Sequence, residues 1–265
     1  MNVLISGASG GLGRAFAAEC AERGYNLLLT DINAAGLNLV KQGLLRQYDI
    51  KVLINTCDIT CEDDVTLLIN YAKEQNFEID MLLNVAGIDF EGGFTQRSFE
   101  QISSILHVNI EATLRLTYRS LSLRRQNSKF FVVFVSSLAS LYPMPLKATY
   151  AASKRFLLDF SYALGQELKT QNVNVLSLCP GGLPTTQDAM DGILAQGFWG
   201  SVTTNKLEKV ANRTLSRVQK GRKIYIPGML NRTFSIFGKF IPTGVIAKLL
   251  YTRWSKAQKQ WLEIK

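Results

Sequence analysis

The sequence is poor in residues that bind metals or form disulfides. Its 265 residues include one histidine, His107, and four cysteines, Cys20, Cys57, Cys61 and Cys179, none of which is spaced as a Cys-x-x-Cys pair. A structural zinc site needs about four convergent Cys or His ligands, and small disulfide scaffolds are far richer in cysteine. We therefore expect no metal centre and no disulfide framework.

Long apolar runs are also absent. The strongly apolar segment Phe130–Val135 has only six residues, whereas a membrane-spanning helix needs about 20. Nothing ahead of the first apolar segment at Asn2 resembles a signal peptide. With 47% apolar and 19% charged residues, the composition is that of one globular domain and excludes disorder or collagen. These features predict a protein of a reducing, cytoplasmic compartment.

Acidic residues become scarce toward the C-terminus. Residues 206–265 contain 14 Lys/Arg and 2 Asp/Glu, a net charge of +12, whereas residues 1–205 contain 16 and 19, a net charge of −3. The basic character of the chain is thus confined to its last 60 residues. Because no groove-reading motif accompanies this charge, we expect no nucleic-acid partner.

Short apolar segments alternate with amphipathic ones along the chain. Segments typical of buried strands occupy residues 3–5, 26–30, 52–56, 81–84, 130–135, 173–178 and 223–226. Helical periodicity covers residues 12–23, 34–48, 62–75, 99–125, 149–168 and 206–220. Parallel strands need such helical crossovers, which cover both faces of the sheet. We therefore predict a doubly wound α/β fold with a seven-stranded parallel sheet.

A glycine-rich turn, Gly7-Ala8-Ser9-Gly10-Gly11-Leu12-Gly13, follows the first predicted strand and opens the first predicted helix. Glycines let the backbone approach a pyrophosphate closely, and a helix N-terminus offers unpaired N–H groups and a positive dipole end. Alone, the pattern also fits an ordinary turn. Its position between a strand and a helix favours a dinucleotide site that includes Gly7, Ser9, Gly10, Gly11, Leu12 and Gly13.

Asp31 stands 18 residues after Gly13, just past the second predicted strand. A carboxylate at this position accepts hydrogen bonds from the adenosine ribose and repels a 2′-phosphate, so NAD is favoured over NADP as the cofactor. Two alternatives stay open. Asp31 is a cap of the following helix, or Arg14 accommodates a 2′-phosphate and permits NADP.

Three polar residues follow in the second half of the chain. Tyr150 and Lys154 are four residues apart in a helical stretch, which places both side chains on one helix face. An ammonium group, together with an oxidised nicotinamide ring, is expected to lower the pKa of the tyrosine from about 10. Ser137 ends the strand 130–135 at the edge of the sheet where doubly wound folds bind ligands. Its alternative role is to satisfy local backbone groups.

The order and spacing of these motifs resemble the short-chain dehydrogenase/reductase family. The resemblance covers residues 2 to about 227 and rests on the glycine turn, Cys57-Asp58-Ile59-Thr60, Asn84-Val85-Ala86-Gly87, Asn109, Ser137, Tyr150-x3-Lys154 and Pro180-Gly181 through Thr185. It implies a Rossmann fold and hydride transfer at nicotinamide C4. Two residues depart from the family pattern: Ser6 stands in place of a threonine and Val85 in place of an asparagine.

The resemblance also implies roles for single residues. Tyr150 matches the catalytic acid/base, Lys154 the residue that lowers its pKa and holds the nicotinamide ribose, and Ser137 the hydroxyl that orients the substrate. Asn109 matches a residue that kinks the long helix and supports a water relay to the lysine, although a helix-interior asparagine can also be without a role. Cofactor contacts are implied for Asp58, Ile59, Asn84, Ala86, Gly87, Pro180, Gly181 and Thr185. For Asp58, a helix cap before residues 62–64 is the alternative.

The substrate side is suggested by residues 186–205, where the resemblance places a mobile lid. This segment contains Met190, Ile193, Leu194, Phe198 and Trp199. Such side chains favour a hydrophobic carbonyl or alcohol as the substrate, such as a ketoacyl chain or a steroid. Alternatively, they only pack the segment onto the body of the protein.

The shared motifs end near residue 227, so we divide the chain into a catalytic domain, residues 1–227, and a basic amphipathic extension, residues 228–265. Two apolar stripes recur there at helical spacing, namely Leu230, Phe234, Phe237 and Ile241, then Ile246, Leu250, Trp254, Ala257 and Trp261. In one interpretation, residues 230–262 lie on an anionic membrane surface and make the protein peripheral. In the other, they pack on the substrate cleft or a second subunit.

Two functions follow from the sequence. The first is an enzyme that interconverts a secondary alcohol and a ketone with NAD, or less readily with NADP. The second is a non-catalytic Rossmann protein that senses a nucleotide or binds a membrane or partner. Retention of Ser137, Tyr150 and Lys154 favours the enzyme. The resemblance further implies a homodimer or homotetramer built on the helix near residues 99–125 and the helix that carries Tyr150.

Overall fold

The computed structural model describes residues 1–185, 190, 191, 194 and 203–264, and within these the side chains of all residues except 239 and 256–264. Its centre is a seven-stranded sheet in the order β3-β2-β1-β4-β5-β6-β7, all neighbours being parallel. The strands are β1 (Asn2–Ser6), β2 (Asn26–Asp31), β3 (Val52–Thr56), β4 (Met81–Asn84), β5 (Phe130–Val135), β6 (Val173–Leu178) and β7 (Ile224–Tyr225). The prediction of a doubly wound Rossmann fold is thus confirmed.

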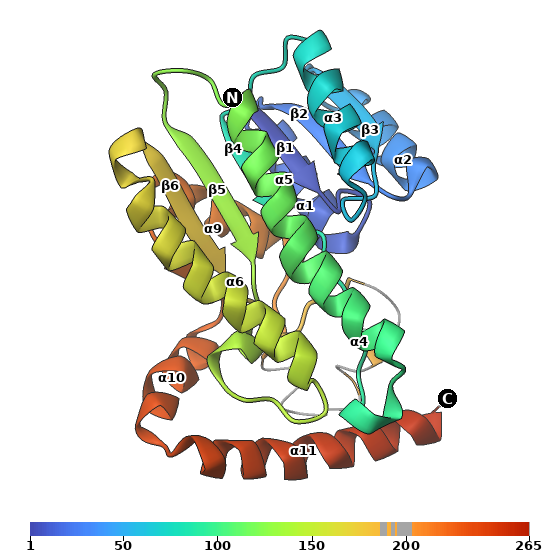
Figure 1. The fold of residues 1–265 in the computed structure, drawn as a ribbon, viewed down its shortest axis with the longest axis vertical. Helices are drawn as coiled ribbons and strands as arrows, with labels where there is room; N and C mark the ends of the chain where they lie inside the picture. Colours follow the sequence, from blue (N-terminus) through green and yellow to red (C-terminus); the bar gives the residue numbers. More distant parts are fainter. Residues whose placement is uncertain (186–189, 192–193, 195–202, 265) are drawn as a thin grey trace.

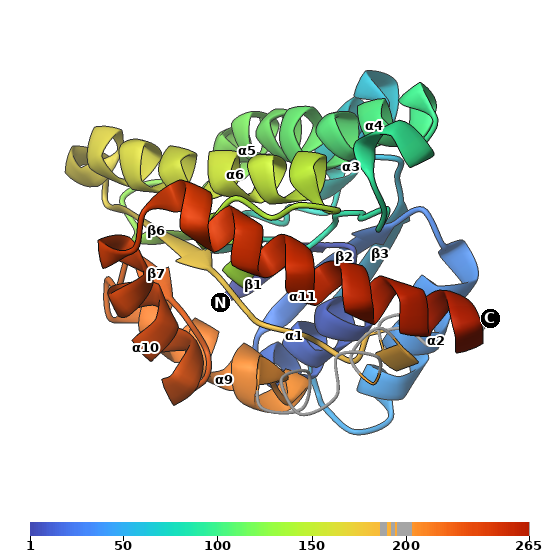
Figure 2. The same ribbon diagram turned by 90° about the horizontal axis from the view of Figure 1, so that it is seen from below.

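Helices cover both faces of the sheet (Figure 2). One face carries α3 (Glu62–Glu74), α4 (Phe99–Leu106), α5 (Thr113–Ser120) and α6 (Ala148–Glu167). The other carries α1 (Gly11–Glu22), α2 (Ala34–Leu45) and α9 (Leu207–Gln219). The strand order reverses between β1 and β4, and ligands of such sheets bind beyond the carboxyl ends of the strands at that point.

Two apolar clusters hold these layers together. One joins the sheet to α1, α2 and α9 through fully buried side chains such as Phe16, and the other joins it to α3, α5 and α6 through Phe130 and Phe134. All six residues of β5 are buried, because helices pack on both of its faces. The continuous apolar run 130–135 is therefore a central strand, as predicted.

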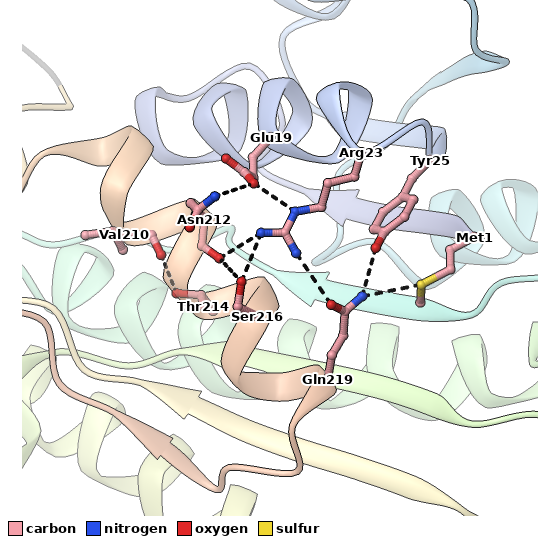
Figure 3. Close-up of polar contacts among 9 residues, drawn as sticks. All are labelled: Met1, Glu19, Arg23, Tyr25, Val210, Asn212, Thr214, Ser216 and Gln219. Atoms are coloured by element: carbon pink, nitrogen blue, oxygen red, sulfur yellow. Dashed lines mark hydrogen bonds and ion pairs between the residues drawn. The ribbon is translucent and has the colours of Figure 1, made fainter.

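A polar network also fixes α1 against α9 (Figure 3). Arg23, near the end of α1, pairs with Glu19 at 2.8 Å, and its Nη2 donates to Asn212 O at 3.0 Å and to Ser216 Oγ at 3.1 Å. Asn212 Nδ2 in turn donates to Glu19 Oε1 at 2.8 Å. These contacts hold the helix that begins at the glycine turn.

The C-terminal extension forms α10 (Met229–Phe237), a 3-10 turn (Gly238–Phe240) and α11 (Thr243–Ile264). In both ribbon views, α11 crosses the end of the molecule at which the strands finish (Figures 1 and 2). The ring of Trp254 lies 5.2 Å from Lys147 Nζ, just before α6. In the described part of the chain, no helix is both long and apolar enough to cross a membrane.

Several predicted boundaries need correction. The long helix predicted over residues 99–125 consists of α4, a π-helical segment (His107–Ala112), α5 and a 3-10 turn (Leu121–Leu123). The helix predicted over 34–48 ends at Leu45, and the last strand is shorter than predicted. Hydrophobic periodicity does not reveal these boundaries, since a π-helical segment inserts one residue without altering the composition.

Candidate active site

The glycine turn is packed too closely for any larger residue. Gly7 has a φ of +65°, and a Cβ there would lie 2.8 Å from Ala86 N. A Cβ at Gly13 would lie 2.0 Å from Gly7 O, and one at Gly11 would lie 2.9 Å from Thr185 Cα. The turn thus brings together three predicted segments that are far apart in sequence, with Ala86 and Thr185 on either side of it.

The N-terminus of α1 suits an anionic ligand. In the described chain no side chain caps this end of the helix, because the N-cap residue is Gly10. The first turn also contains no acidic residue. The N–H groups of such a turn have no partner inside the helix and lie at the positive end of its dipole. The residues present therefore fit the pyrophosphate of a dinucleotide.

Asp31 lies beside this turn at the end of β2. Its Oδ2 accepts from Ser9 N at 2.9 Å and its Oδ1 from Asn33 N at 3.0 Å. The cap of α2 is Asn33, whose Oδ1 accepts from Gly36 N. The alternative that Asp31 is the cap of α2 is therefore wrong. Arg14 Nε donates to Ser9 O at 2.7 Å, so a cation lies close to the same corner.

Asp58 and Ile59, two of the predicted cofactor contacts, have different environments. Asp58 Oδ1 accepts from Thr60 N at 2.9 Å and from Thr60 Oγ1 at 2.7 Å, whereas Cys61 is the N-cap of α3. The alternative in which Asp58 caps this helix is therefore wrong. Ile59 is buried in the core beneath α3, which leaves only its backbone for a ligand.

Asn84 and its neighbours tie β4 to the rest of the site. Asn84 Nδ2 donates to Thr117 Oγ1 at 3.0 Å. Ser6 Oγ accepts from Val85 N at 3.2 Å and from Ala86 N at 3.3 Å, so the serine supplies the hydroxyl contact at a position where the family has threonine.

The structure brings Ser137, Tyr150 and Lys154 together. Ser137 follows β5, and the other two lie on the first turns of α6. Lys154 Nζ lies 5.7 Å from the centroid of the Tyr150 ring and donates to Val135 O at 3.0 Å. Ser137 Oγ accepts from Ala139 N at 3.1 Å, so the hydroxyl also serves the local backbone. The same Ser137 side chain hydrogen-bonds Tyr150, a contact that only partly offsets the larger effect of burial, which raises the pKa of the phenol.

The expected lowering of the Tyr150 pKa by an ammonium group together with an oxidised nicotinamide ring stays a prediction, and the protein groups alone act in the opposite direction. Burial is the main effect on Tyr150, and together with the charge of Asp89 it raises the pKa of the phenol above its usual 10. Lys147, rather than Lys154, is the cation that acts against this increase. The reason is that Lys154 is itself almost fully buried, and desolvation lowers its pKa to about 8. The protein groups alone therefore hold Tyr150 as a neutral phenol.

Asn109 occupies the π-helical segment between α4 and α5 and is fully buried. Its Oδ1 accepts from Ile88 N at 2.8 Å, while Nδ2 donates to Ile88 O at 2.9 Å and to Ser153 Oγ at 3.1 Å. A Cβ on Gly87 would lie 3.0 Å from both Asn109 Oδ1 and Lys154 Nζ. Since Ala86 contacts the glycine turn, residues 86 and 87 join the turn to the lysine.

The loop after β6 completes the cofactor side. Pro180 O accepts from Leu138 N at 2.7 Å, and Gly181 N donates to Asn205 Oδ1 at 3.3 Å. A Cβ on Gly181 would lie 2.2 Å from Thr203 O, so this position also requires glycine. Of the apolar residues expected in the lid, Met190 and Leu194 are exposed. Ile193, Phe198 and Trp199 lie outside the described residues.

Sequence reasoning missed a charged cluster beside the tyrosine. Lys147 Nζ pairs with Asp89 Oδ2 at 2.8 Å and with Glu91, and it lies 5.7 Å from the Tyr150 ring centroid. The cluster spans the segment after β4 and the residue before α6. The only sequence signal was three charged residues that lie a few positions outside the segments assigned to the site.

Comparison with known proteins agrees with this geometry. Human inactive hydroxysteroid dehydrogenase-like protein 1 is 30% identical over 198 residues, which are 74% of this chain and 60% of that protein. The very-long-chain 3-oxoacyl-CoA reductase of Eremothecium gossypii is 31% identical over 179 residues, 65% of this chain and 51% of that protein. The chain thus spans between one half and two thirds of the length of these relatives.

A solved structure shows the same fold. The 3-ketoacyl-(acyl-carrier-protein) reductase from Brucella melitensis, complexed with NADH, superposes with a TM-score of 0.73 at 22% identity, over 86% of this chain and 97% of that one. The family model described as short chain dehydrogenase matches residues 1–191. The chain belongs to the short-chain dehydrogenase/reductase family.

Proposed function

We propose that this protein is an NAD(P)-dependent oxidoreductase that interconverts a ketone and a secondary alcohol. The proposal rests mainly on a series of close contacts through residues 86 and 87. Ala86 borders the glycine turn, and Gly87 borders Asn109 and Lys154. A cofactor held at the turn is thus placed toward Tyr150, whose ring lies near the same lysine. The family membership supports the same chemistry.

The protein's own groups supply the proton for the reducing direction. A bound reduced nicotinamide supplies the hydride for the carbonyl carbon. Tyr150, held as a neutral phenol by burial, donates its proton to the carbonyl oxygen. Ser137 orients that oxygen with its hydroxyl, and Lys154 holds the nicotinamide ribose and returns a proton to the phenolate. Asn109 holds the Ile88 backbone beside the lysine and thus maintains the geometry.

NAD is the proposed cofactor, because Asp31 presents a carboxylate beside Ser9 where a 2′-phosphate would otherwise lie. The substrate is proposed to be hydrophobic. Tyr150 borders a pocket whose apolar wall consists of Phe90, Phe94, Ile102 and Ile105. The names of the relatives, a hydroxysteroid dehydrogenase-like protein and a 3-oxoacyl-CoA reductase, support a steroid-like or ketoacyl substrate class.

The competing function is that of a non-catalytic nucleotide-binding protein, which the name of the human relative also raises. The retained group of Ser137, Tyr150 and Lys154 favours catalysis here. The test is the absorbance of NADH and NADPH during incubation with hydrophobic ketones, for the parent protein and Tyr150→Phe. We expect faster turnover with NADH, and a loss of about 100-fold or more in kcat for the variant with cofactor binding nearly intact. Equal turnover by parent and variant contradicts the proposal.

A further inference from the structure

Arg97 lines the pocket beside Tyr150 and carries a charge without a counterion. Its Nε is buried without a hydrogen-bond partner. Within the described part of the chain, Arg97 takes part in no ion pair either. A buried guanidinium N–H without an acceptor is costly, so such a group normally has a partner. Arg97 lines the pocket, so a ligand there can approach its guanidinium group.

The backbone holds Arg97 in this position. A Cβ on Gly92 would lie 2.6 Å from Arg97 Nη2 and 2.7 Å from Nε, so the guanidinium rests against the bare glycine. Gly92 has a φ of +138°, a conformation that side chains rarely allow, and its N–H donates to Leu146 O at 2.9 Å. This bond ties the loop to the segment that leads into α6. Arg97 therefore has a preformed place beside the tyrosine.

The nearby carboxylates face Lys147, although one oxygen of Asp89, Oδ1, is buried without a hydrogen-bond partner. Asp89 and Glu91 both pair with Lys147. Counting Arg97, Lys147 and Lys154 against these two acids leaves one positive charge in excess around the pocket. Phe90, Phe94, Ile102 and Ile105 supply the apolar part of the lining, and Gln101 and Thr149 add neutral polar groups. A partly apolar pocket with one unpaired guanidinium is complementary to an amphiphile with an acidic group.

We infer that Arg97 binds an oxyanion of the substrate, and that the preferred substrates are hydrophobic ketones or alcohols that carry a carboxylate. This inference rests on the proposed function for its kinetic test, but its binding test does not need turnover. A guanidinium matches a carboxylate with two parallel N–H···O bonds, and within the described residues Arg97 forms no ion pair with a carboxylate of the protein itself.

The kinetic test uses medium-chain oxo acids that differ in the position of the ketone, each paired with its methyl ester. For the parent protein we expect a KM about 10- to 100-fold lower for the acid than for the ester. In Arg97→Met the acid-to-ester ratio falls toward one through a higher KM for the acid. Arg97→Lys keeps part of the ratio. A phosphate monoester of a hydroxyketone, added as a third probe, distinguishes carboxylate from phosphate recognition.

The binding test compares decanoate with decanol by the shift in thermal unfolding of each protein. Decanoate stabilises the parent more than decanol does, and Arg97→Met abolishes the difference. Arg155→Met is the matched control, because Arg155 pairs with the exposed Asp159 on α6 and lies outside the pocket. This control keeps both the decanoate shift and the acid preference of the parent.

The two failures are distinguishable. If neither acids nor esters are turned over but decanoate still binds through Arg97, the proposed function is wrong and this inference stands. If esters are turned over as well as acids, or Arg97→Met weakens both alike, the inference is wrong and the oxidoreductase stands. An Arg97→Met protein that fails to fold is replaced by Arg97→Gln, and the same comparisons apply.

Discussion

Lys154 is a buried ammonium with few compensating contacts. It is 4% exposed, its Nζ donates to Val135 O, and burial lowers its pKa from 10.5 to about 8. Between these two values the unfolded chain binds more protons than the folded one, so this residue makes stability rise with pH. Its cost is about 3 kcal/mol at pH 7 and roughly half of that at pH 9.5.

The prediction is that Lys154→Met is stabilised relative to the parent at pH 7, and that this gain shrinks by about half at pH 9.5. Urea unfolding at the two pH values measures the difference. The difference between variants is needed because burial also raises the pKa of Cys20 and Cys57 to about 12, which makes the stability of both proteins fall with pH. A stability difference that is independent of pH contradicts the assignment of a depressed pKa to Lys154.

For single residues, the sequence predicted those whose positions follow from the regular spacing of a helix or from the end of a strand. Tyr150 and Lys154 are one helical turn apart, and Ser137 ends a strand whose apolar character is unmistakable. Lys147 and Arg97 were not predicted, because their roles depend on a loop conformation. Arg97 is placed by the left-handed backbone of Gly92, and Lys147 by two acids nearly 60 residues away. Nothing in composition or periodicity encodes such contacts.

Among the elements, the π-helical segment between α4 and α5 is central to the site because it contains Asn109. Asn109 there makes both hydrogen bonds to the Ile88 backbone and a third to Ser153. Asn109→Ala leaves the part-buried N–H and C=O of Ile88 without these partners, and each lost partner costs about 1–3 kcal/mol. We predict a loss of roughly 2–5 kcal/mol in the free energy of unfolding, together with a lower kcat, because Lys154 borders the same Gly87.

Denaturant unfolding and NADH oxidation measure these two effects. Asn38→Ala is the control, since the Asn38 side chain is exposed on α2 and bonds only to its own helix through Ala34 O. Its expected change is within about 0.5 kcal/mol. A similarly small change in Asn109→Ala contradicts a structural role for this asparagine and returns it to the alternative of a helix-interior residue without a function.

Element type was predictable where hydrophobic periodicity was long and regular. All seven strands were found because their cores are continuous apolar runs between turn residues. The interruption of the helix near residue 107 was not predicted, since a π-helical segment does not change the hydrophobic pattern and Asn109 makes its contacts there with residues far away in sequence. In the C-terminal extension, periodicity predicted the helices correctly but not which face of each helix packs on the rest of the protein. That choice depends on what the rest of the fold offers to pack against.

On the scale of the whole molecule, one face of the C-terminal extension is half-buried and the other is exposed. Ile246, Leu250 and Trp254, one of the predicted stripes, are half-buried against the body, and Trp254 contacts Lys147 at the pocket. Ala257 and Trp261 of that stripe lie outside the described side chains. Trp254 thus lies next to a residue of the pocket, and packing of the extension on the cleft stays a prediction. The outer face remains apolar, with Met229, Ile236, Phe237, Phe240, Val245, Leu249 and Tyr251 exposed.

We propose that this outer face rests on an anionic membrane surface. Residues 228–262 contain no acidic residue, and the exposed Lys248 accompanies the exposed apolar side chains. In Figures 1 and 2, α10 and the start of α11 meet at one corner of the molecule. Interfacial segments combine such aromatic and aliphatic residues with cations that attract acidic headgroups.

Co-sedimentation with vesicles tests this surface. We predict that the full chain pellets with phosphatidylserine-containing vesicles more than with pure phosphatidylcholine, and less at high salt. Phe237 and Phe240 are 64% and 81% exposed, and each contributes about 1.5 kcal/mol when inserted. Replacing both with serine therefore lowers the partition roughly 100-fold. The control replaces Leu39 and Leu67, comparably exposed on α2 and α3, with serine and leaves pelleting unchanged. Equal pelleting by both double variants contradicts the membrane contact and leaves a second subunit as the occupant of this face.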